Sequence, residues 1–176
     1  MLRATIVVLA TLLSLSTMSI ASNEVEVLPN CSLKLAVETT ASKETIWRLW
    51  SDVENWKKFD TILQYSYLKD NAEFTEGAIG YLKAKGAPKT KFELIEVNDG
   101  VSFIEELKVP LYQTIKLQRY FEENENGLTT FVHEVNFRGG LRHIYYALLA
   151  GTFKKELGVV MGNLKKVAEE EERQDN

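Results

Sequence analysis

The chain has 176 residues, a length typical of a single domain. Hydrophobic residues make up 45% and charged residues 26% of it, which excludes a disordered or collagen-like chain. There are 21 Lys and Arg against 25 Asp and Glu, for a net charge of -4, so the basic surplus of a nucleic-acid-binding protein is missing. One Cys and two His leave little material for a metal site, and we expect neither a metal nor a cofactor.

Residues 1–21 have the order of a secretory signal peptide. A basic start at Arg3 precedes an apolar run, and Ser19-Ile20-Ala21 places small residues where a signal peptidase requires them. The apolar run is shorter than the ~20 residues of a membrane-spanning helix. We therefore expect an exported protein, periplasmic or secreted, that is cleaved after Ala21. An uncleaved membrane anchor is the alternative.

The remaining chain, residues 22–176, is expected to form one domain that opens with a strand and two short helices. Alternating apolar residues predict a strand over 32–40. Ser42 then caps a predicted helix over 43–50, and Asp52 opens a second one that continues through Phe59.

The middle of the chain is predicted to be a meander of strands. The period-two pattern predicts strands over 62–68, 79–85, 89–97, 101–109, 112–123 and 128–137. The turns between them are short, so neighbouring strands should pair antiparallel.

From residue 141 onward, apolar residues recur at helical spacing and predict one long helix. Its stripe includes Leu148, Leu149, Phe153 and Met161, which should face the sheet. The acidic tail from about residue 170 is expected to be disordered. The predicted fold class is α+β: a curved seven-stranded antiparallel sheet wrapped around the C-terminal helix, with an apolar volume between them.

The segment ASKETIWRLWSDVENW, from Ala41 to Trp56, resembles the opening pattern of the SRPBCC or START-like superfamily. This is the helix-grip group that includes polyketide cyclase/dehydrase and lipid-transport proteins. The Gly77-Ala78-Ile79-Gly80 start of the third strand and the late amphipathic helix agree with it, over about residues 33–170. The resemblance implies the helix-grip fold and an internal hydrophobic cavity. It implies no particular reaction, because within the family this opening pattern marks packing.

Three ionisable residues fall on the apolar faces of adjacent predicted strands. Glu105 shares its face with Phe103, Arg119 shares its face with Leu117, and His133 lies among apolar neighbours on the next strand. A buried charge is costly unless it is paired, so Glu105 is expected to pair with Arg119 or His133. The group could orient a ligand or serve in acid–base catalysis. A structural ion pair, or a bulge that turns one residue outward, is the alternative.

Further candidates for a cavity lining lie on the second strand and on the long helix. Tyr65 and Tyr67 alternate onto one face of their strand, and Tyr145 lies on the helix stripe. Tyrosine combines an apolar ring with a hydroxyl that can direct a ligand, although core tyrosines have the same pattern. The full set of ligand-binding candidates is Tyr65, Tyr67, Phe103, Glu105, Leu117, Arg119, His133, Tyr145, Leu149 and Phe153.

Four lysines flank the predicted turn at residues 86–88. Lys83, Lys85, Lys89 and Lys91 share one parity and are candidates for transient contact with anionic lipid head groups. The alternative is a set of solvent-facing lysines that prevent edge-to-edge pairing of the hairpin.

The sequence favours an exported, non-enzymatic carrier or binding protein for a small hydrophobic or amphipathic, lipid-like ligand. One alternative is a polyketide cyclase- or dehydratase-like enzyme with Glu105 or His133 as its acid or base. Export argues against that enzyme, because activated carrier-bound substrates are cytoplasmic. The second alternative is a structural or interaction domain with a filled cavity. No catalytic-triad order and no HExxH pattern is present, so nothing in the sequence requires catalysis.

Overall fold

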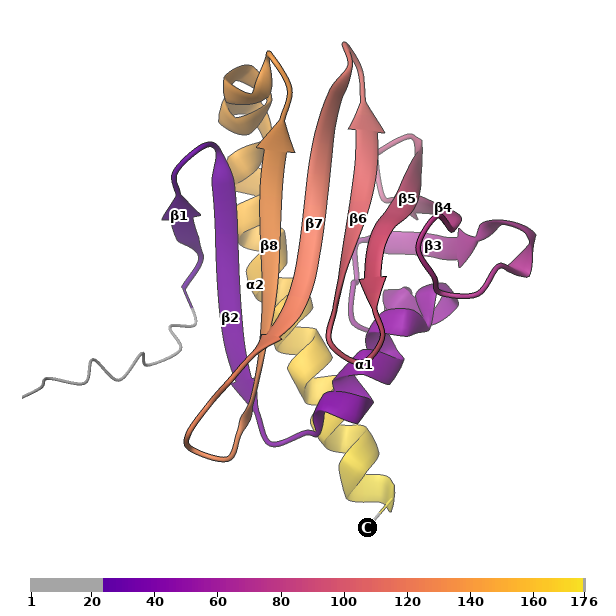
Figure 1. Cartoon of the computed structure of the whole chain (residues 1–176), viewed down its shortest axis with the longest axis vertical. Coiled ribbons are helices and arrows are strands. Elements are labelled where there is room, and N and C mark those ends of the chain that lie inside the picture. The colour runs from indigo at the N-terminus through magenta and orange to yellow at the C-terminus, as the bar shows by residue number, and fades with distance from the viewer. Residues whose placement is uncertain (1–23, 176) are drawn as a thin grey trace, which may run out of the picture.

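The computed structural model describes residues 24–175 and shows an α+β fold in which a long C-terminal helix lies across one antiparallel sheet (Figure 1). The elements are β1 (Glu26–Leu28), β2 (Ser32–Thr39), α1 (Lys43–Ser51), the 3-10 helix η1 (Val53–Lys58), β3 (Leu63–Leu68), the 3-10 helix η2 (Lys69–Asn71), β4 (Ile79–Ala84), β5 (Lys89–Asn98), β6 (Ser102–Val109), β7 (Gln113–Glu122), β8 (Thr129–Arg138) and α2 (Arg142–Asp175). The strand order is β1-β2-β8-β7-β6-β5-β4-β3. The last strand therefore returns to pair with β2, and β3 to β8 form the predicted meander.

The sheet has eight strands, where the sequence pattern predicted seven. The additional strand is β1, which pairs with the start of β2 through a tight turn at Asn30 and Cys31. Both turn residues have a φ of 62°, as in the hairpin turns that match the twist of a sheet. A three-residue strand is too short to show a period-two pattern, so alternation along the chain does not indicate β1. The signal-peptide prediction falls on residues outside the described part of the chain.

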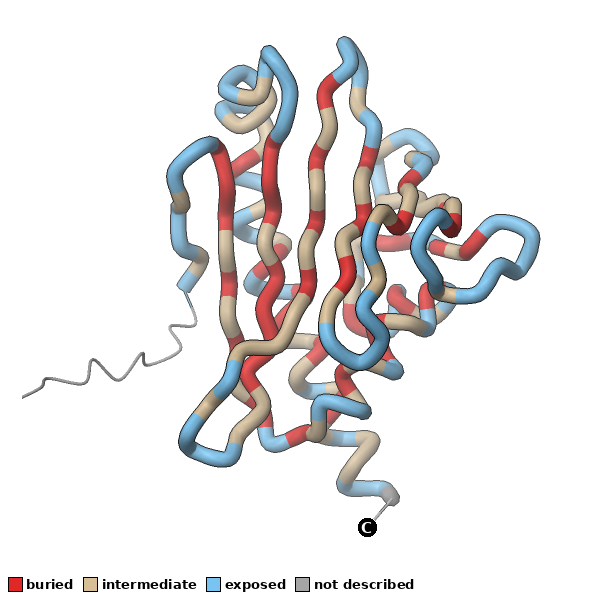
Figure 2. Tube along the Cα trace, viewed as in Figure 1, coloured by how far each residue is buried: buried red, intermediate tan, exposed pale blue. Residues whose placement is uncertain are grey.

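The inner face of the sheet carries the core and is covered by helices (Figure 2). α2 packs against β2 and β8 and also contacts α1 (Figure 1). Trp50 of α1 is buried against the rings of Phe103 and Phe131. α2 therefore covers the β2–β8 part of the sheet, and Trp50 of α1 packs on the inner face beside it.

The buried stripe of α2 lies mainly on its second half. Leu157, Met161 and Leu164 are almost fully buried, and Leu149 is half-buried. Leu148 was predicted to face the sheet, but its side chain is 72% exposed. Helical spacing shows which side of a helix is apolar, but it does not show how far along the helix the sheet covers that side. None of the helices within residues 24–175 is long and apolar enough to span a membrane.

The C-terminal tail is helical up to Asp175, which corrects the expected disorder from about residue 170. Contacts with α1 explain the difference. The side chain of Ser42 caps α1 by accepting a bond from the Thr45 amide at 3.2 Å, as predicted. Glu172 in turn accepts bonds from the Ser42 amide at 2.7 Å and from the Thr45 hydroxyl at 2.7 Å. The acidic tail is thus joined to the N-terminus of α1.

Candidate ligand-binding site

The three ionisable residues predicted to share one face lie together on the inner face of the sheet. Arg119 on β7 is directly opposite Phe103 on β6 and His133 on β8, and Glu105 is two residues along β6. Their exposed fractions are 1% for Glu105, 7% for Arg119 and 6% for His133. No bulge interrupts the β6–β7 and β7–β8 ladders, so the parity of the sequence pattern is preserved in space.

Glu105 and Arg119 form a buried ion pair. Arg119 Nη1 donates to Glu105 Oε2 at 3.3 Å. Burial raises the pKa of Glu105, and the charge and hydrogen bond of Arg119 act against that shift. The Arg119 guanidinium also lies 5.2 Å from the ring centre of Trp56 and 5.1 Å from that of Phe103. These cation–π contacts hold the charge in place while leaving most of its N–H donors free of Glu105.

His133 is the unusual member of the group. Neither Nδ1 nor Nε2 of its buried ring has a hydrogen-bond partner within residues 24–175. Burial, with a further contribution from the Arg119 charge, lowers the pKa of His133 well below its usual 6.5, so the ring is neutral at physiological pH. A neutral imidazole offers one donor and one acceptor, and leaving both unused is costly. The arrangement is therefore complementary to a group that both donates and accepts, such as a hydroxyl.

Asp60 is a fourth ionisable residue near this group, and no sequence pattern indicated it. Its carboxylate accepts a bond from the Ile62 amide at 3.3 Å. Burial raises the pKa of Asp60 to about 6, and the charge of Arg119 is the largest influence in the opposite direction. Asp60 lies in the connection between η1 and β3, where no period-two or helical pattern reports which way a side chain faces.

Tyr65 and Tyr67 lie on the outer face of the sheet, opposite to the face that the sequence pattern indicated. The ladder between β3 and β4 is irregular between Leu63 and Tyr65, and this shifts the alternation by one residue. The two rings lie 6.1 Å apart, and Tyr67 also accepts a bond from Lys89 Nζ at 2.7 Å. The same ammonium lies 4.1 Å above the ring of Tyr81. These tyrosines form an outer aromatic–lysine cluster and do not line the inner face.

The other lysines of the predicted head-group contact lie in the same region. Lys83 donates to the carbonyl of Ala87, and Lys85 donates to the carbonyl of Thr61 at 2.9 Å. Lys91 is exposed. Several of these ammonium groups are therefore already bonded within the β4–β5 hairpin and its neighbours.

The remaining candidates lie on the inner face or along α2. Leu117 is buried beside Glu105 in the β6–β7 ladder. Phe153 is half-buried, with its ring edge-on to Phe137 at 5.6 Å. Tyr145 is also half-buried, and its hydroxyl is committed to the carbonyl of Pro110 at 2.9 Å.

One further contact was not anticipated. Cys31 Sγ lies 3.0 Å from His143 Nδ1, which pairs the single thiol with a histidine 112 residues away in the chain. The part of the chain that the structure describes holds no group of three or more His, Cys, Asp or Glu side chains arranged for a metal ion.

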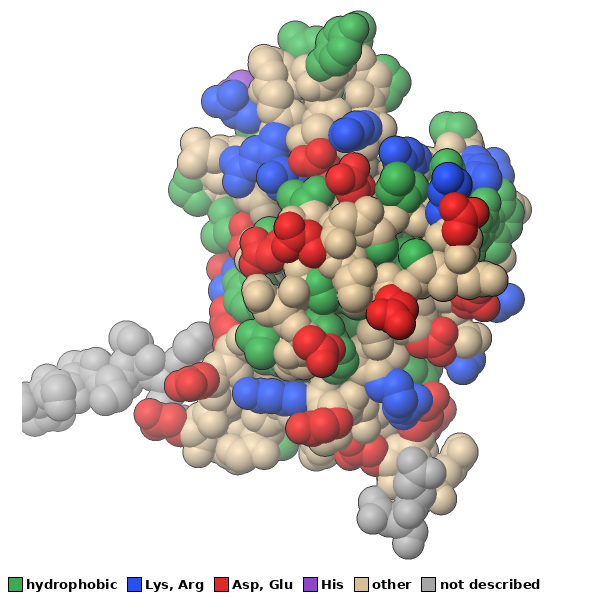
Figure 3. Space-filling view, turned by 45° about the vertical axis from the view of Figure 1, so that its right-hand side comes forward, with side chains coloured by type: hydrophobic (Ala, Val, Ile, Leu, Met, Phe, Trp, Pro, Cys, Tyr) green, Lys and Arg blue, Asp and Glu red, His purple; other side chains and the backbone are tan. Residues whose placement is uncertain are grey.

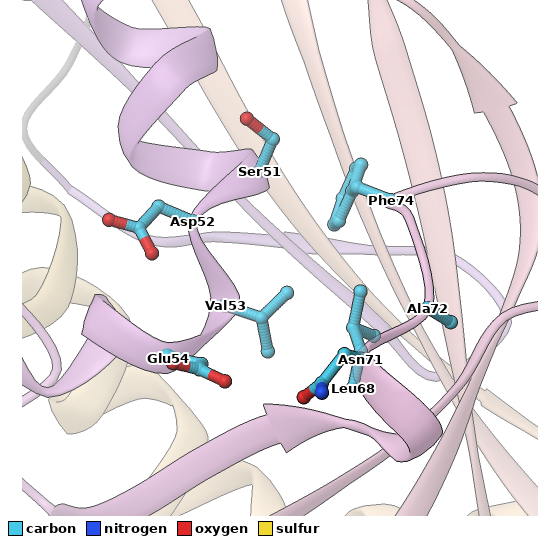
Figure 4. A pocket seen from close by; sticks show the side chains of 8 residues that line it. All are labelled: Ser51, Asp52, Val53, Glu54, Leu68, Asn71, Ala72 and Phe74. Atoms are coloured by element: carbon cyan, nitrogen blue, oxygen red, sulfur yellow. The ribbon is translucent and has the colours of Figure 1, made fainter.

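A separate pocket of about 230 Å³ lies between the end of α1 and the loop after η2 (Figure 4). Its lining residues are Ser51, Asp52, Val53, Glu54, Leu68, Asn71, Ala72 and Phe74. Val53 points into the space, whereas the carboxylate of Asp52 points away from it (Figure 4). The pocket shares no lining residue with the polar group on the inner face.

Comparisons with known proteins support the fold only. No protein-family model and no curated protein matches the chain. A protein from Arthrobacter aurescens superposes with a TM-score of 0.63 at 14% sequence identity, over 84% of this chain and 91% of that one. Protein NE0264 from Nitrosomonas europaea gives 0.61 at 16% identity, over 84% and 99% of the two chains. Protein MLL2253 from Mesorhizobium loti gives 0.61 at 11% identity, over 79% and 97%. Identities this low show a shared α+β fold and say nothing of a shared function.

Proposed function

We propose that this protein is a START-like, helix-grip carrier that binds a small amphipathic molecule between its sheet and α2. The observation that supports this most is the buried, neutral ring of His133, with two unused nitrogens beside the Arg119 guanidinium. Apolar side chains such as Phe103 and Leu117 surround these polar groups. A ligand would gain most of its affinity from apolar burial, at about 25 cal/mol per Å², and its orientation from these few polar contacts.

Binding is better supported than acid–base catalysis. Glu105 is held in an ion pair with Arg119. If Glu105 took up a proton during catalysis, the buried Arg119 guanidinium would lose its counter-charge. His133 has a strongly depressed pKa and would be a weak base.

The proposal includes export, which rests on the order of charged, apolar and small residues in 1–21. Expressed with its native start in a bacterium, the protein should be recovered from the periplasm with Ser22 as its first residue. N-terminal sequencing measures this, and retention of Met1 in a membrane fraction would favour an anchor.

Native mass spectrometry of the purified protein tests the binding function. The wild type should carry a co-purifying ligand, or take up a long-chain fatty alcohol added at micromolar concentration. His133→Phe should lose that adduct while remaining folded, because phenylalanine fills the ring volume but offers no hydrogen bond. His143→Phe makes the same change at an exposed histidine and should keep the adduct.

Two results would contradict the proposal. One is a wild type that shows no adduct before or after incubation with the alcohol. The other is a His133→Phe protein that binds as the wild type does while gaining about 1–3 kcal/mol of stability, as expected when a purely structural unsatisfied group is removed.

A further inference from the structure

One end of the molecule presents apolar side chains to solvent. The turn between β6 and β7 exposes Leu111 and Tyr112, the first at 67% and the second completely. Leu141, just before α2, and Ile144 and Leu148, in its first two turns, are also exposed. The β6–β7 turn and the start of α2 lie at the same end in Figure 1. We call these five residues the apolar end.

The backbone of the β6–β7 turn holds its two apolar side chains outward. Leu111 has a φ of 58° and Tyr112 a φ of 56°. Two successive left-handed residues form the kind of hairpin turn in which Asn and Gly are usual. Bulky side chains are disfavoured there, so this turn accepts strain that an Asn-Gly pair would avoid.

The turn and the helix are bound to each other, so they form one surface. The Tyr145 hydroxyl donates to the Pro110 carbonyl at 2.9 Å. The Gln113 side chain accepts a bond from the Leu141 amide at 2.7 Å, which fixes the start of the helix against the turn. These bonds set the positions of the apolar side chains relative to one another without burying them.

The charge around the apolar end is positive. Residues 107–115 contain one basic residue, Lys108, and residues 135–155 contain four, and neither stretch contains an acidic residue. Lys108 and Arg138 both lie beside Thr114 in the sheet, one rung below the turn, and Arg142 opens α2. Lys108 is 67% exposed and lies 3.9 Å from Glu93. Figure 3 shows hydrophobic side chains protruding at the top of the molecule with Lys and Arg side chains just below them.

We propose that the apolar end docks on the surface of an anionic lipid bilayer. Protruding aliphatic and tyrosine side chains insert at the level of the head groups, and basic residues behind them contact the lipid phosphates. A second copy of the chain fits this surface less well, because two such ends would bring like charges together. This inference is independent of the ligand proposed above. It concerns where the protein docks. Vesicle binding tests the docking surface, and native mass spectrometry tests the ligand, so either proposal can fail while the other holds.

Co-sedimentation with lipid vesicles tests this inference. The wild type should bind vesicles of phosphatidylcholine mixed with phosphatidylglycerol, and should bind pure phosphatidylcholine at least ~10-fold less, with binding reduced by added salt. Replacing Leu111 and Tyr112 together by Ser should lower the partition coefficient on anionic vesicles by at least ~10-fold. Val101→Ser is the matched control, because Val101 is 59% exposed in the turn at the opposite end of β6 and should have no effect.

Thermal melting of each variant checks that the fold is intact. Leu111, Tyr112, Val101 and Lys108 are exposed, and Arg142 is half-buried. Lys108→Gln combined with Arg142→Gln should reduce binding to anionic vesicles while leaving melting unchanged. The inference is overturned if the wild type does not bind anionic vesicles, or if the Leu111/Tyr112 variant binds as the wild type does. It is also overturned if light scattering shows a dimer that the same Ser variant dissociates, because the apolar end would then be an interface between two copies.

Discussion

Glu105 and Arg119 illustrate how one buried pair can be structural or functional depending on what surrounds it. The pair provides a hydrogen-bond partner for one carboxylate oxygen and one guanidinium nitrogen. The two ring nitrogens of His133 beside it have no hydrogen-bond partner within the described residues. A buried ion pair by itself contributes little net stability, because desolvation offsets the attraction. Its members nevertheless become strongly destabilising when only one of them is removed.

We expect Arg119→Met to lower the free energy of unfolding by ~3–5 kcal/mol, because it leaves the Glu105 carboxylate buried without a partner. Adding Glu105→Gln should restore most of that loss, since the double variant buries no charge. Urea denaturation of the wild type, of each single variant (Arg119→Met and Glu105→Gln) and of the double variant measures the coupling energy. An equal free energy of unfolding for Arg119→Met and the wild type would show that the pair is solvated in solution.

Asp60 gives a pH dependence whose sign follows from its raised pKa. The folded pKa is about 6 against an ordinary value of 3.8, so the folded state holds the proton more tightly than the unfolded state. The resulting stability is present below about pH 4 and is lost as the pH rises through about 6. Asp60→Asn should therefore be more stable than wild type at pH 7, by about 2–3 kcal/mol, and nearly equal to it at pH 4.

Urea denaturation at several pH values from 4 to 7 measures this difference. His133 has a lowered pKa, so it makes the protein less stable as the pH falls below about 6.5. That effect is present in both proteins and cancels when they are subtracted. Asp70→Asn, at a side chain that is 81% exposed, is the control and should show no such trend. A constant Asp60→Asn difference across this range would contradict the assigned burial.

Among the elements, the pairing of β4 with β5 depends on the absence of a side chain at one position. Gly80 lies directly opposite Phe92, whose ring covers the place where a Cβ would stand. A Cβ at Gly80 would lie 2.0 Å from the tip of that ring. Phe92 cannot easily move away, because it is almost fully buried and stacks on Trp56 at 5.6 Å.

Gly80→Ala should therefore destabilise the protein by ~1–3 kcal/mol, as overpacking of a core does. Gly151→Ala provides a control of opposite sign, because Gly151 lies within α2 with open space around it. Alanine there should be neutral or should stabilise by up to ~1 kcal/mol through helix propensity. Thermal melting compares the two variants. A Gly80→Ala protein that melts like wild type would show that the β4–β5 hairpin adjusts freely.

At the scale of the whole molecule, the tail of α2 joins the C-terminal part of the chain to the N-terminal part at one end of the domain. The Glu172 carboxylate accepts bonds from the Ser42 amide, the Ser42 hydroxyl and the Thr45 hydroxyl at 2.6–2.7 Å. Thr39 donates to Glu169 at 2.9 Å in the same region. These contacts link residues about 130 positions apart in sequence and position α1 over the end of the sheet.

Glu172→Ala should lower the melting temperature by a few degrees, which corresponds to about 1 kcal/mol for a domain of this size. Hydrogen bonds from Ser42 and Thr45 lower the pKa of Glu172, so its contribution is present at neutral pH and is lost as the pH falls through that lowered pKa. Glu170→Ala removes an exposed carboxylate two residues earlier and is the control. Equal melting of the two variants would show that the link between α2 and α1 does not contribute to stability.

The sequence by itself determined the elements and the inward-facing polar residues. Period-two alternation located β2 to β8. It placed Glu105, Arg119 and His133 on one face because no bulge interrupts the β6–β7 and β7–β8 ladders. The amphipathic pattern located α2, and Ser42 located the start of α1.

Only the tertiary structure decided the features that depend on distant partners. The irregular β3–β4 ladder turned the side chains of Tyr65 and Tyr67 to the outer face of the sheet. The unanticipated strand β1 forms only by pairing with β2. Asp60 reached the neighbourhood of Arg119 through a connection without periodicity. Leu148 became exposed because the sheet does not cover that face of α2. A local pattern records which side of an element is apolar, whereas packing decides what that side meets and how far the contact extends.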